Sequence, residues 1–293
     1  MNPVSRGHLA MLTFSALVAG SFSLGSLAAN EISPNALTAI RFLLATGVIG
    51  LVAMATGGLP RDMWRAPWRY FILGGLFAAY FVLMFEGLKT AAPVSTAAVF
   101  TLTPLISAGF GWTLLRQITT RRMAIALGIG ATGALWVIFR ADWHAFLQFR
   151  VGQGEMYYFC GCVLHAAYTP MVRKLNRGEA SVAFSFGSLA AGCILLAIWG
   201  WNDIVTTDWA GLPSIVWITL GYLTVFSTAA TFVLLQYASL NLPSAKVMAY
   251  TYLVPSWVTI WEIALGHGAP NLLILIGVVL TVIALLLLLR DEH

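Results

Sequence analysis

The sequence predicts an all-α integral membrane protein with ten transmembrane helices, and three observations support this fold class. Of its 293 residues, 59% are hydrophobic and 9% are charged, whereas soluble domains carry about 25% charged residues. The apolar residues gather in stretches near the length of about 20 residues that crosses a bilayer. Most of the 16 Lys and Arg residues fall on alternate connections between these stretches, the distribution of the positive-inside rule.

The expected spans follow one another along the whole chain. They cover residues 9–29, 37–57, 70–88, 94–115, 123–140, 155–171, 181–200, 212–235, 244–265 and 271–289. With the N-terminus inside, most basic connections face the cytoplasm, so we expect both termini there. The expected location is a bacterial-type cytoplasmic (inner) membrane. The net charge of +5 then reflects topology, and we expect no nucleic-acid partner.

Ten spans divide into two fives, and an odd number in each half places the halves in opposite orientations. Aligning Pro104 with Pro255 pairs residues 88–115 with residues 239–266, and each segment carries a loop proline followed by a mid-span proline. The sequence therefore predicts two inverted five-helix repeats. The expected division is 1–141 for the first repeat, 142–154 for a linker loop and 155–293 for the second repeat.

Three stretches resemble the EamA repeat of the drug/metabolite transporter superfamily. They read AIRFLLA at 39–45, GLKTAAPVSTAAVFTLTP at 87–104 and ASLNLPSAKVMAYTYLVP at 238–255. The resemblance covers essentially the whole chain and is closest in kind to the branch of amino-acid and metabolite exporters. It implies ten helices in inverted five-helix repeats around a central cavity, and export of small metabolites.

Spans two and three carry charges near their outer ends. Glu86 and Lys89 are three residues apart, which suits an ion pair on one helix. The alternative is that Arg41, at the start of span two, meets Glu86 across helices and forms an outer gate. Deeper in span three, Tyr80 and Met84 share a face and suit apolar or aromatic groups of a solute; ordinary helix packing is the other interpretation.

Pro104 and Pro255 each predict a break in a spanning helix, because proline supplies no N–H to the carbonyl one turn earlier. Those carbonyls lie near Phe100 and Thr251. One interpretation is that the broken backbone lines the cavity, where a solute or water satisfies it. The alternative is a kink satisfied by a neighbouring Ser or Thr. The pairing of the two prolines between the repeats favours the cavity.

Span six carries a stripe of polar rings. Tyr157, Tyr158, Gly161, His165 and Tyr168 fall on one helical face. A bundle interior accommodates such a face better than lipid does. Tyr157 and Tyr158 are also shallow enough for an interfacial aromatic belt. His165 is either a satisfied packing residue or a proton-coupling site.

Span nine offers two candidate faces, and the sequence leaves open which one lines the cavity. One face holds Lys246, Tyr250, Trp257 and Trp261, and the other holds Thr251, Pro255 and Glu262. Glu262, near His267, is a coupling group or a carboxylate that reaches the outer interface. Lys246 is an inner gate or a cation that reaches the cytoplasmic interface.

The candidate site residues follow from these patterns. For substrate binding they are Tyr80, Met84, Phe100, His165, Tyr168, Tyr250, Thr251 and Trp257, and for coupling or gating they are Lys246, Glu262, Glu86 and Arg41. No paired aspartates, His-Glu-x-x-His spacing or Cys/His cluster occurs, so we expect no catalytic residue, metal or cofactor. A membrane enzyme is therefore disfavoured.

The expected function is export of small neutral organic solutes by alternating access. Amino acids, including aromatic ones, are the first expectation, because few buried charges suit a net-neutral ligand; drugs or other metabolites are the alternative. We expect a small-molecule substrate and the lipid bilayer as partners. A monomer is compatible with the sequence, which leaves open the oligomeric state, the direction of transport, and proton coupling against facilitated diffusion.

Overall fold

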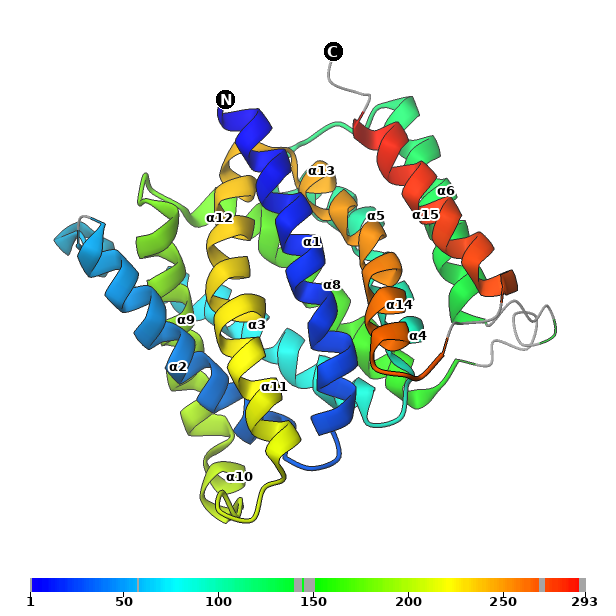
Figure 1. Cartoon of the computed structure of the whole chain (residues 1–293). Coiled ribbons are helices and arrows are strands. Elements are labelled where there is room, and N and C mark those ends of the chain that lie inside the picture. Colours follow the sequence, from blue (N-terminus) through cyan, green and yellow to red (C-terminus); the bar gives the residue numbers. More distant parts are fainter. Residues whose placement is uncertain (1, 57, 140–143, 145–150, 269–271, 290–293) are drawn as a thin grey trace.

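The structure, a computed structural model, describes residues 2–56, 58–139, 144, 151–268 and 272–289. Within these ranges all regular structure is helical (Figure 1). Most of the expected linker 142–154 lies outside the described residues, and the helix after it begins at Gln153.

The helices of the first repeat are α1 (Pro3–Ala28), α2 (Pro34–Ala55), the short turn η1 (Arg61–Arg65), α3 (Trp68–Leu88), α4 (Pro93–Phe100), α5 (Thr103–Leu115) and α6 (Arg121–Ile138). Those of the second repeat are α8 (Gln153–Leu175), α9 (Ser181–Trp199), the short α10 (Trp201–Thr206), α11 (Ser214–Thr224), η2 (Val225–Ala230), α12 (Thr231–Asn241), α13 (Ser244–Ala249), η3 (Tyr250–Leu253), α14 (Val254–Ala264) and α15 (Leu272–Leu289). Of the short elements, η2 is a turn of π-helix and η3 a turn of 3₁₀-helix.

In the described part of the chain, ten spans result when each interrupted helix is counted once. Eight of them are long and apolar enough to cross a membrane by length and composition. The other two are α8, which carries polar rings and charges, and the interrupted α13–α14. Some helices extend beyond the predicted apolar windows. The first begins at Pro3 because the Asn2 side chain accepts the Ser5 N–H at 2.7 Å and caps it.

Contacts between the two repeats occur in matching pairs. The first span packs on the eighth (α1 on α11 and α12) as the sixth packs on the third (α8 on α3). Likewise α1 contacts α14 as α8 contacts α5. The α2–α9 and α6–α15 pairs each join a helix to its own counterpart, and Figure 1 shows both pairs side by side. This is the pattern of two repeats related by a pseudo-two-fold axis in the membrane plane.

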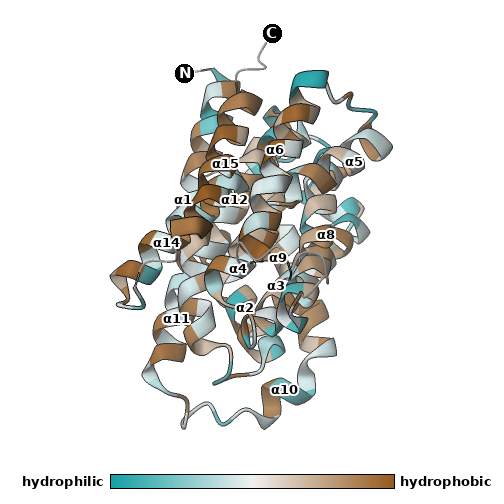
Figure 2. Cartoon of the chain, turned by 90° about the vertical axis from the view of Figure 1, so that its right-hand side faces the viewer, coloured by the Kyte–Doolittle hydropathy of each residue, from teal (hydrophilic) through white to brown (hydrophobic). Residues whose placement is uncertain are grey.

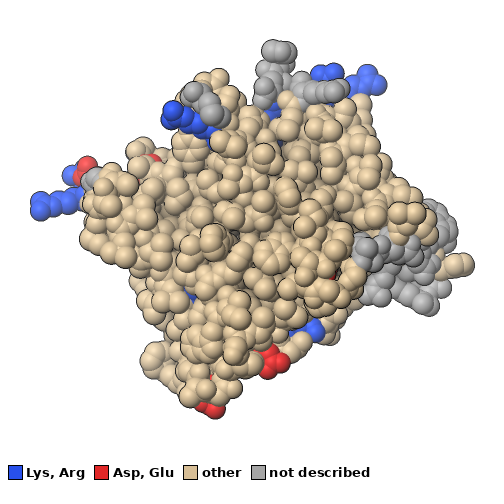
Figure 3. Space-filling model, in the orientation of Figure 1, with Lys and Arg blue, Asp and Glu red and all other residues tan. Residues whose placement is uncertain are grey.

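The exterior of the bundle suits lipid. Apolar residues predominate along the helices in Figure 2, and large side chains such as Leu51, Met54, Ile198 and Leu272 are exposed. On the face drawn in Figure 3, most visible Lys and Arg side chains lie along the upper edge, on the side where α1 begins. We call this side, where α1 begins and α15 ends, the terminal side (Figure 1).

Glycines allow the closest helix approaches. A Cβ built on Gly74 of α3 would lie 2.4 Å from the Ser188 carbonyl oxygen and 2.5 Å from the Gly192 nitrogen of α9. A Cβ on Gly133 of α6 would similarly lie 2.7 Å from the Gly277 carbonyl oxygen of α15. Small residues at helix crossings in membranes serve this purpose, since backbone packing replaces the hydrophobic effect there.

Candidate functional site

Aromatic side chains from both repeats meet inside the bundle. We call this set the ring cluster; its members are Phe14, Phe22, Phe42, Phe77, Tyr80, Phe81, Phe100, Tyr158, His165, Tyr168 and Phe232, all buried. Phe77 of α3 has ring centroids of Tyr168 and Phe232 at 4.4 Å and 4.3 Å. These spacings are those of rings in contact. In this conformation the rings therefore occupy the position where the sequence predicted a central cavity.

His165 lies among the rings with an unmet hydrogen-bonding atom. Its ring centroid is 4.6 Å from Tyr80, 5.1 Å from Phe100 and 5.2 Å from Phe77. Its Nδ1 has no hydrogen-bond partner among the described residues. A buried polar atom without a partner is unfavourable by about 1–3 kcal/mol. A solute polar group entering the cluster would relieve this penalty.

Two side-chain hydrogen bonds cross the ring cluster. The Tyr80 and Tyr158 hydroxyls are 3.0 Å apart, and the Gln236 amide donates to the Tyr168 hydroxyl at 3.0 Å. Gln236, on α12, also leaves its Oε1 without a partner among the described residues. The sequence analysis missed this residue, because it lies one position beyond the predicted span 212–235.

The adjacent tyrosines of span six point in different directions. Tyr158 is fully buried, so the belt interpretation is wrong for it. Tyr157 is 39% exposed, and its hydroxyl accepts a hydrogen bond from Gln153 at 3.1 Å. The predicted stripe therefore narrows to Tyr158, Gly161, His165 and Tyr168, while Tyr157 faces outward.

Removing the Tyr80 hydroxyl with Tyr80→Phe is expected to lower the free energy of unfolding by about 1–2 kcal/mol, because one buried hydrogen bond is lost. Tyr157→Phe is the matched control and should change it by less than about 0.5 kcal/mol. Thermal unfolding in mild detergent measures both. Equal effects of the two changes would contradict the assignment of Tyr80 to a buried hydrogen bond.

The spans that contain Pro104 and Pro255 are both interrupted, and threonines or backbone N–H groups satisfy the breaks. The first half of span four ends at Phe100, whose carbonyl accepts the Thr103 hydroxyl. In span nine the Thr251 carbonyl accepts the Val254 N–H, and the Tyr252 carbonyl accepts the Thr281 hydroxyl of α15 at 2.9 Å. These breaks match the kink alternative, so the freed carbonyls need no ligand in this conformation. The Thr251 hydroxyl, fully buried, has no partner among the described residues.

The two faces of span nine are both largely inside the bundle. Tyr250 and Trp257 point to α1, where their polar atoms meet His8 at 3.0 Å and Ser15 at 3.2 Å. Lys246 is buried in α13, near the terminal side. Neither face joins the ring cluster through a ring contact among the described residues, whereas Phe100 of span four does. Met84 is buried on α3, one turn beyond Tyr80.

Of the charged candidates, Glu86 and Glu262 lie in ion pairs, whereas Lys246 and Arg41 are buried. Glu86 pairs with Lys89 at 2.8 Å, and Glu262 pairs with His267 at 2.9 Å. Both pairs are partly exposed and lie at the ends of α3 and α14, away from the terminal side. Arg41 does not meet Glu86, so that alternative is wrong. Arg41, on α2, is instead fully buried in the protein.

A buried ion pair joins α3 to the loop between α8 and α9. The sequence analysis placed both of its residues in connections between spans. Arg69 donates to Glu179 at 2.6 Å, to the Leu175 carbonyl at 2.7 Å and to the Ala66 carbonyl at 3.2 Å. Burial alone would raise the pKa of Glu179, but the hydrogen bonds from Arg69 and the Arg177 N–H outweigh it and hold the pKa below its usual range. These contacts join the start of α3 to the end of α8 and the loop after it, at the terminal side.

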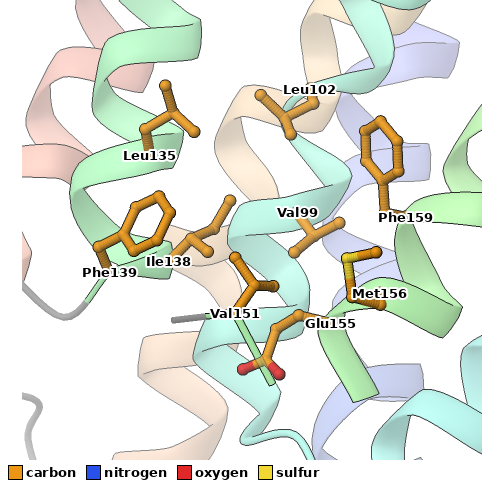
Figure 4. A pocket seen from close by; sticks show the side chains of 9 residues that line it. All are labelled: Val99, Leu102, Leu135, Ile138, Phe139, Val151, Glu155, Met156 and Phe159. Atoms are coloured by element: carbon orange, nitrogen blue, oxygen red, sulfur yellow. The ribbon is translucent and has the colours of Figure 1, made fainter. Parts of the chain in front are cut away.

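A separate apolar crevice of about 250 Å³ lies between α4, α6 and α8 (Figure 4). Its one charged lining residue, Glu155, accepts a hydrogen bond from Ser95 at 2.8 Å and lies in the first turn of α8. Met156, Phe159 and Leu135, which also line it, are exposed to the lipid side. None of the predicted site residues lines this crevice, so it is distinct from the ring cluster.

The two halves of this fold match one known repeat. Residues 5–139 and residues 152–290 each match the EamA-like transporter family. The chain belongs to the EamA-like transporter family. It is also 23% identical over 283 residues to the Bacillus subtilis protein named Uncharacterized transporter YyaM, covering 95% of this chain and 92% of the relative.

A second relative of this chain comes from Archaeoglobus fulgidus and is named an uncharacterized transporter. It is 23% identical over 297 residues, and the match covers 99% of both chains. A crystal structure of a protein superposes with a TM-score of 0.73 at 20% identity over 99% of both chains. At this identity the likeness shows the fold alone. Membership establishes a multi-pass membrane transporter and confirms the predicted superfamily, while the substrate is a separate question.

Proposed function

We propose that this transporter exports small neutral organic solutes, above all amino acids including aromatic ones, by alternating access. The observation that carries the proposal is the ring cluster with the unpartnered His165 Nδ1 and Gln236 Oε1 inside it. Rings accept an apolar or aromatic side chain through stacking and edge contacts. The unmet polar atoms favour a solute that also carries hydrogen-bonding groups.

Drugs or other metabolites are the second candidate, because rings alone also accept apolar drugs. Two polar atoms lacking partners distinguish the candidates. A purely apolar ligand would leave His165 Nδ1 and Gln236 Oε1 unsatisfied, whereas an amino acid offers both donors and acceptors.

The proposed cycle uses the symmetry of the repeats. Matching contacts between the halves suit a rocking motion in which the ring cluster separates first toward one side and then toward the other. We place the terminal side in the cytoplasm, because the basic connections gather there. The bacterial inner membrane is the proposed location.

Counterflow in proteoliposomes tests this function. Vesicles preloaded with one unlabelled amino acid should accumulate the same labelled amino acid, with saturable uptake of neutral and aromatic members of a panel. Counterflow needs no imposed ion gradient, so it works whether export is facilitated or coupled to protons through Glu262, Glu86 or His165.

Tyr80→Ala and His165→Ala are expected to reduce this counterflow at least about tenfold, since both shape the ring cluster. Tyr157→Ala, on the outward face of the same helix as His165, should retain it. Folded wild-type protein that exchanges no amino acid in the panel would contradict the amino-acid proposal and leave drugs or other metabolites.

A further inference from the structure

Arg41 is a fully buried cation in the outer half of α2, and none of the ion pairs among the described residues includes it. Its Nε donates to the Thr228 hydroxyl and its Nη2 donates to the Ser227 carbonyl at 3.1 Å. Its guanidinium carbon lies 3.7 Å from the ring centroid of Phe81. These contacts hold the group in place but supply no negative charge.

One terminal nitrogen of the guanidinium makes no hydrogen bond to the described residues. Nη1 has no hydrogen-bond partner among the described residues, although the side chain is fully buried. Burying a charge without a counter-ion is strongly unfavourable, and such residues in membrane spans mark ligand or ion sites. A guanidinium with a free arm is suited to a carboxylate, because its fork matches the two oxygens.

Further unpartnered hydroxyls lie on the adjoining helical faces. Thr38 precedes Arg41 by three residues on α2, so the two side chains share a face. Thr224 precedes Thr228 by four residues at the end of α11. Both are buried, and both hydroxyls lack a partner among the described residues. The α2 helix contacts α11 and η2, so the helices that carry these hydroxyls come from two repeats and pack against each other.

The local helix geometry supports a site at this place. Ser227 and Thr228 belong to η2, the single turn of π-helix that interrupts span eight. Such turns are rare and frequently occur at functional sites, because they release backbone carbonyls and shift side chains. Here the Ser227 carbonyl accepts Arg41 and also the Thr231 hydroxyl at 2.8 Å, while the Ser227 hydroxyl meets Ser21 of α1.

We infer that Arg41, supported by Thr38 and Thr224, anchors the carboxylate of the transported solute while the solute's apolar part lies in the ring cluster. Phe81 connects the two regions: it lies under Arg41, and its ring centroid is 5.1 Å from Phe77 and 4.7 Å from Tyr80. The inference rests on the proposed function and narrows its substrates to solutes that carry a carboxylate. One unpaired buried cation matches one carboxylate of a zwitterion.

Three ligands with the same phenyl ring test the inference: phenylalanine, 3-phenylpropionate, which lacks the amine, and phenylethylamine, which lacks the carboxylate. Each is added to the purified chain in a neutral maltoside detergent, where no anionic lipid competes. Phenylalanine and 3-phenylpropionate are expected to raise the melting temperature by about 2–4 °C at roughly ten times the dissociation constant. Phenylethylamine at the same concentration should raise it markedly less.

Arg41→Met is expected to abolish the advantage of the two carboxylates over phenylethylamine. Lys89→Met is the matched control: it removes one positive charge from the same outer side, where Lys89 pairs with Glu86, and should keep the advantage. If Arg41→Met does not fold, the wild-type protein still tests the carboxylate requirement, because phenylethylamine must then raise the melting temperature less than the two carboxylates do.

The outcomes separate this inference from the proposed function. Equal stabilisation by phenylethylamine, no stabilisation by either carboxylate, or an advantage that survives in Arg41→Met would overturn the role of Arg41. In the first and third cases amino-acid counterflow would still support the function. Carboxylate stabilisation that depends on Arg41, without counterflow of any amino acid, would keep the anchor and remove amino acids as the substrates.

Discussion

Replacing Glu179 by Gln is expected to lower the free energy of unfolding by about 3 kcal/mol. The change removes the negative charge beside Arg69, whose side chain is only 2% exposed. Breaking a buried ion pair by removing one partner leaves an uncompensated charge, with a typical effect of about 3–5 kcal/mol. Gln retains one acceptor for Arg69, which places the expected value at the lower end. Thermal unfolding in mild detergent measures the effect.

The chain offers a matched control for this prediction. Asp62 and Arg65 form an ion pair at 3.2 Å, but their side chains are 77% and 79% exposed. Exposed pairs are screened by solvent and contribute little. Asp62→Asn should therefore leave the melting temperature unchanged within error. An equal loss in both variants would show that Arg69 is not a buried cation that depends on Glu179.

The Glu179 contribution should also depend on pH. Its pKa lies below the ordinary value of 4.5 in the folded chain. The stabilisation is therefore fully present above the unfolded-state pKa and is lost as pH falls through the folded-state pKa. The difference in stability between the wild type and Glu179→Gln is expected to be constant near neutral pH and to shrink below about pH 4.5. A difference that grows on acidification would contradict this sign.

Gly74→Ala is the second change with a large expected effect, a loss of up to about 3 kcal/mol in the free energy of unfolding. The added Cβ would lie 2.4 Å from the Ser188 carbonyl oxygen and 2.5 Å from the Gly192 nitrogen. Both neighbours are backbone atoms, so α3 and α9 must move apart. Unfolding in detergent and the yield of monodisperse protein measure the loss.

Gly75→Ala is the control on the adjacent residue. Its Cβ would meet only the Cδ1 atom of Leu195 at 3.3 Å, the end of a flexible side chain. Alanine is also a better helix former than glycine. Gly75→Ala is therefore expected to be neutral or slightly stabilising. A destabilisation as large as that of Gly74→Ala would point to a general need for helix flexibility and not to the crossing with α9.

The spans were predictable because lipid demands long apolar helices, and the prolines located the interruptions of spans four and nine. The hydrogen-bond partners of the carbonyl groups at those interruptions were not predictable. The Thr281 hydroxyl reaches the Tyr252 carbonyl from another helix, and nothing in the spacing of either segment indicates that contact. The position of a proline in the sequence indicates where a helix breaks. Which group then bonds to the free carbonyl depends on tertiary packing.

The candidate site shows the same limit. Tyr80, Phe100, His165 and Tyr168 were selected as polar or aromatic residues on helix faces, and the structure brings them together. Arg41 was placed at the outer start of span two as a gating candidate that could meet Glu86. Its support comes from Thr228, far along the chain. Phe77 and Phe81 were missed, although Phe77 lies three residues before Tyr80 and four before Phe81, which places it on one face of α3 with each of them.

The matched contacts between the repeats also bear on the origin of this chain. Two identical five-helix chains, inserted in opposite directions and paired in the membrane, would make the same set of contacts twice. Duplication and fusion of one gene for such a chain would yield the present arrangement. After fusion the copies are free to diverge, so that Arg41 arises in one half and its Thr228 partner in the other. A binding site shared unequally by the halves is not available to a pair of identical chains.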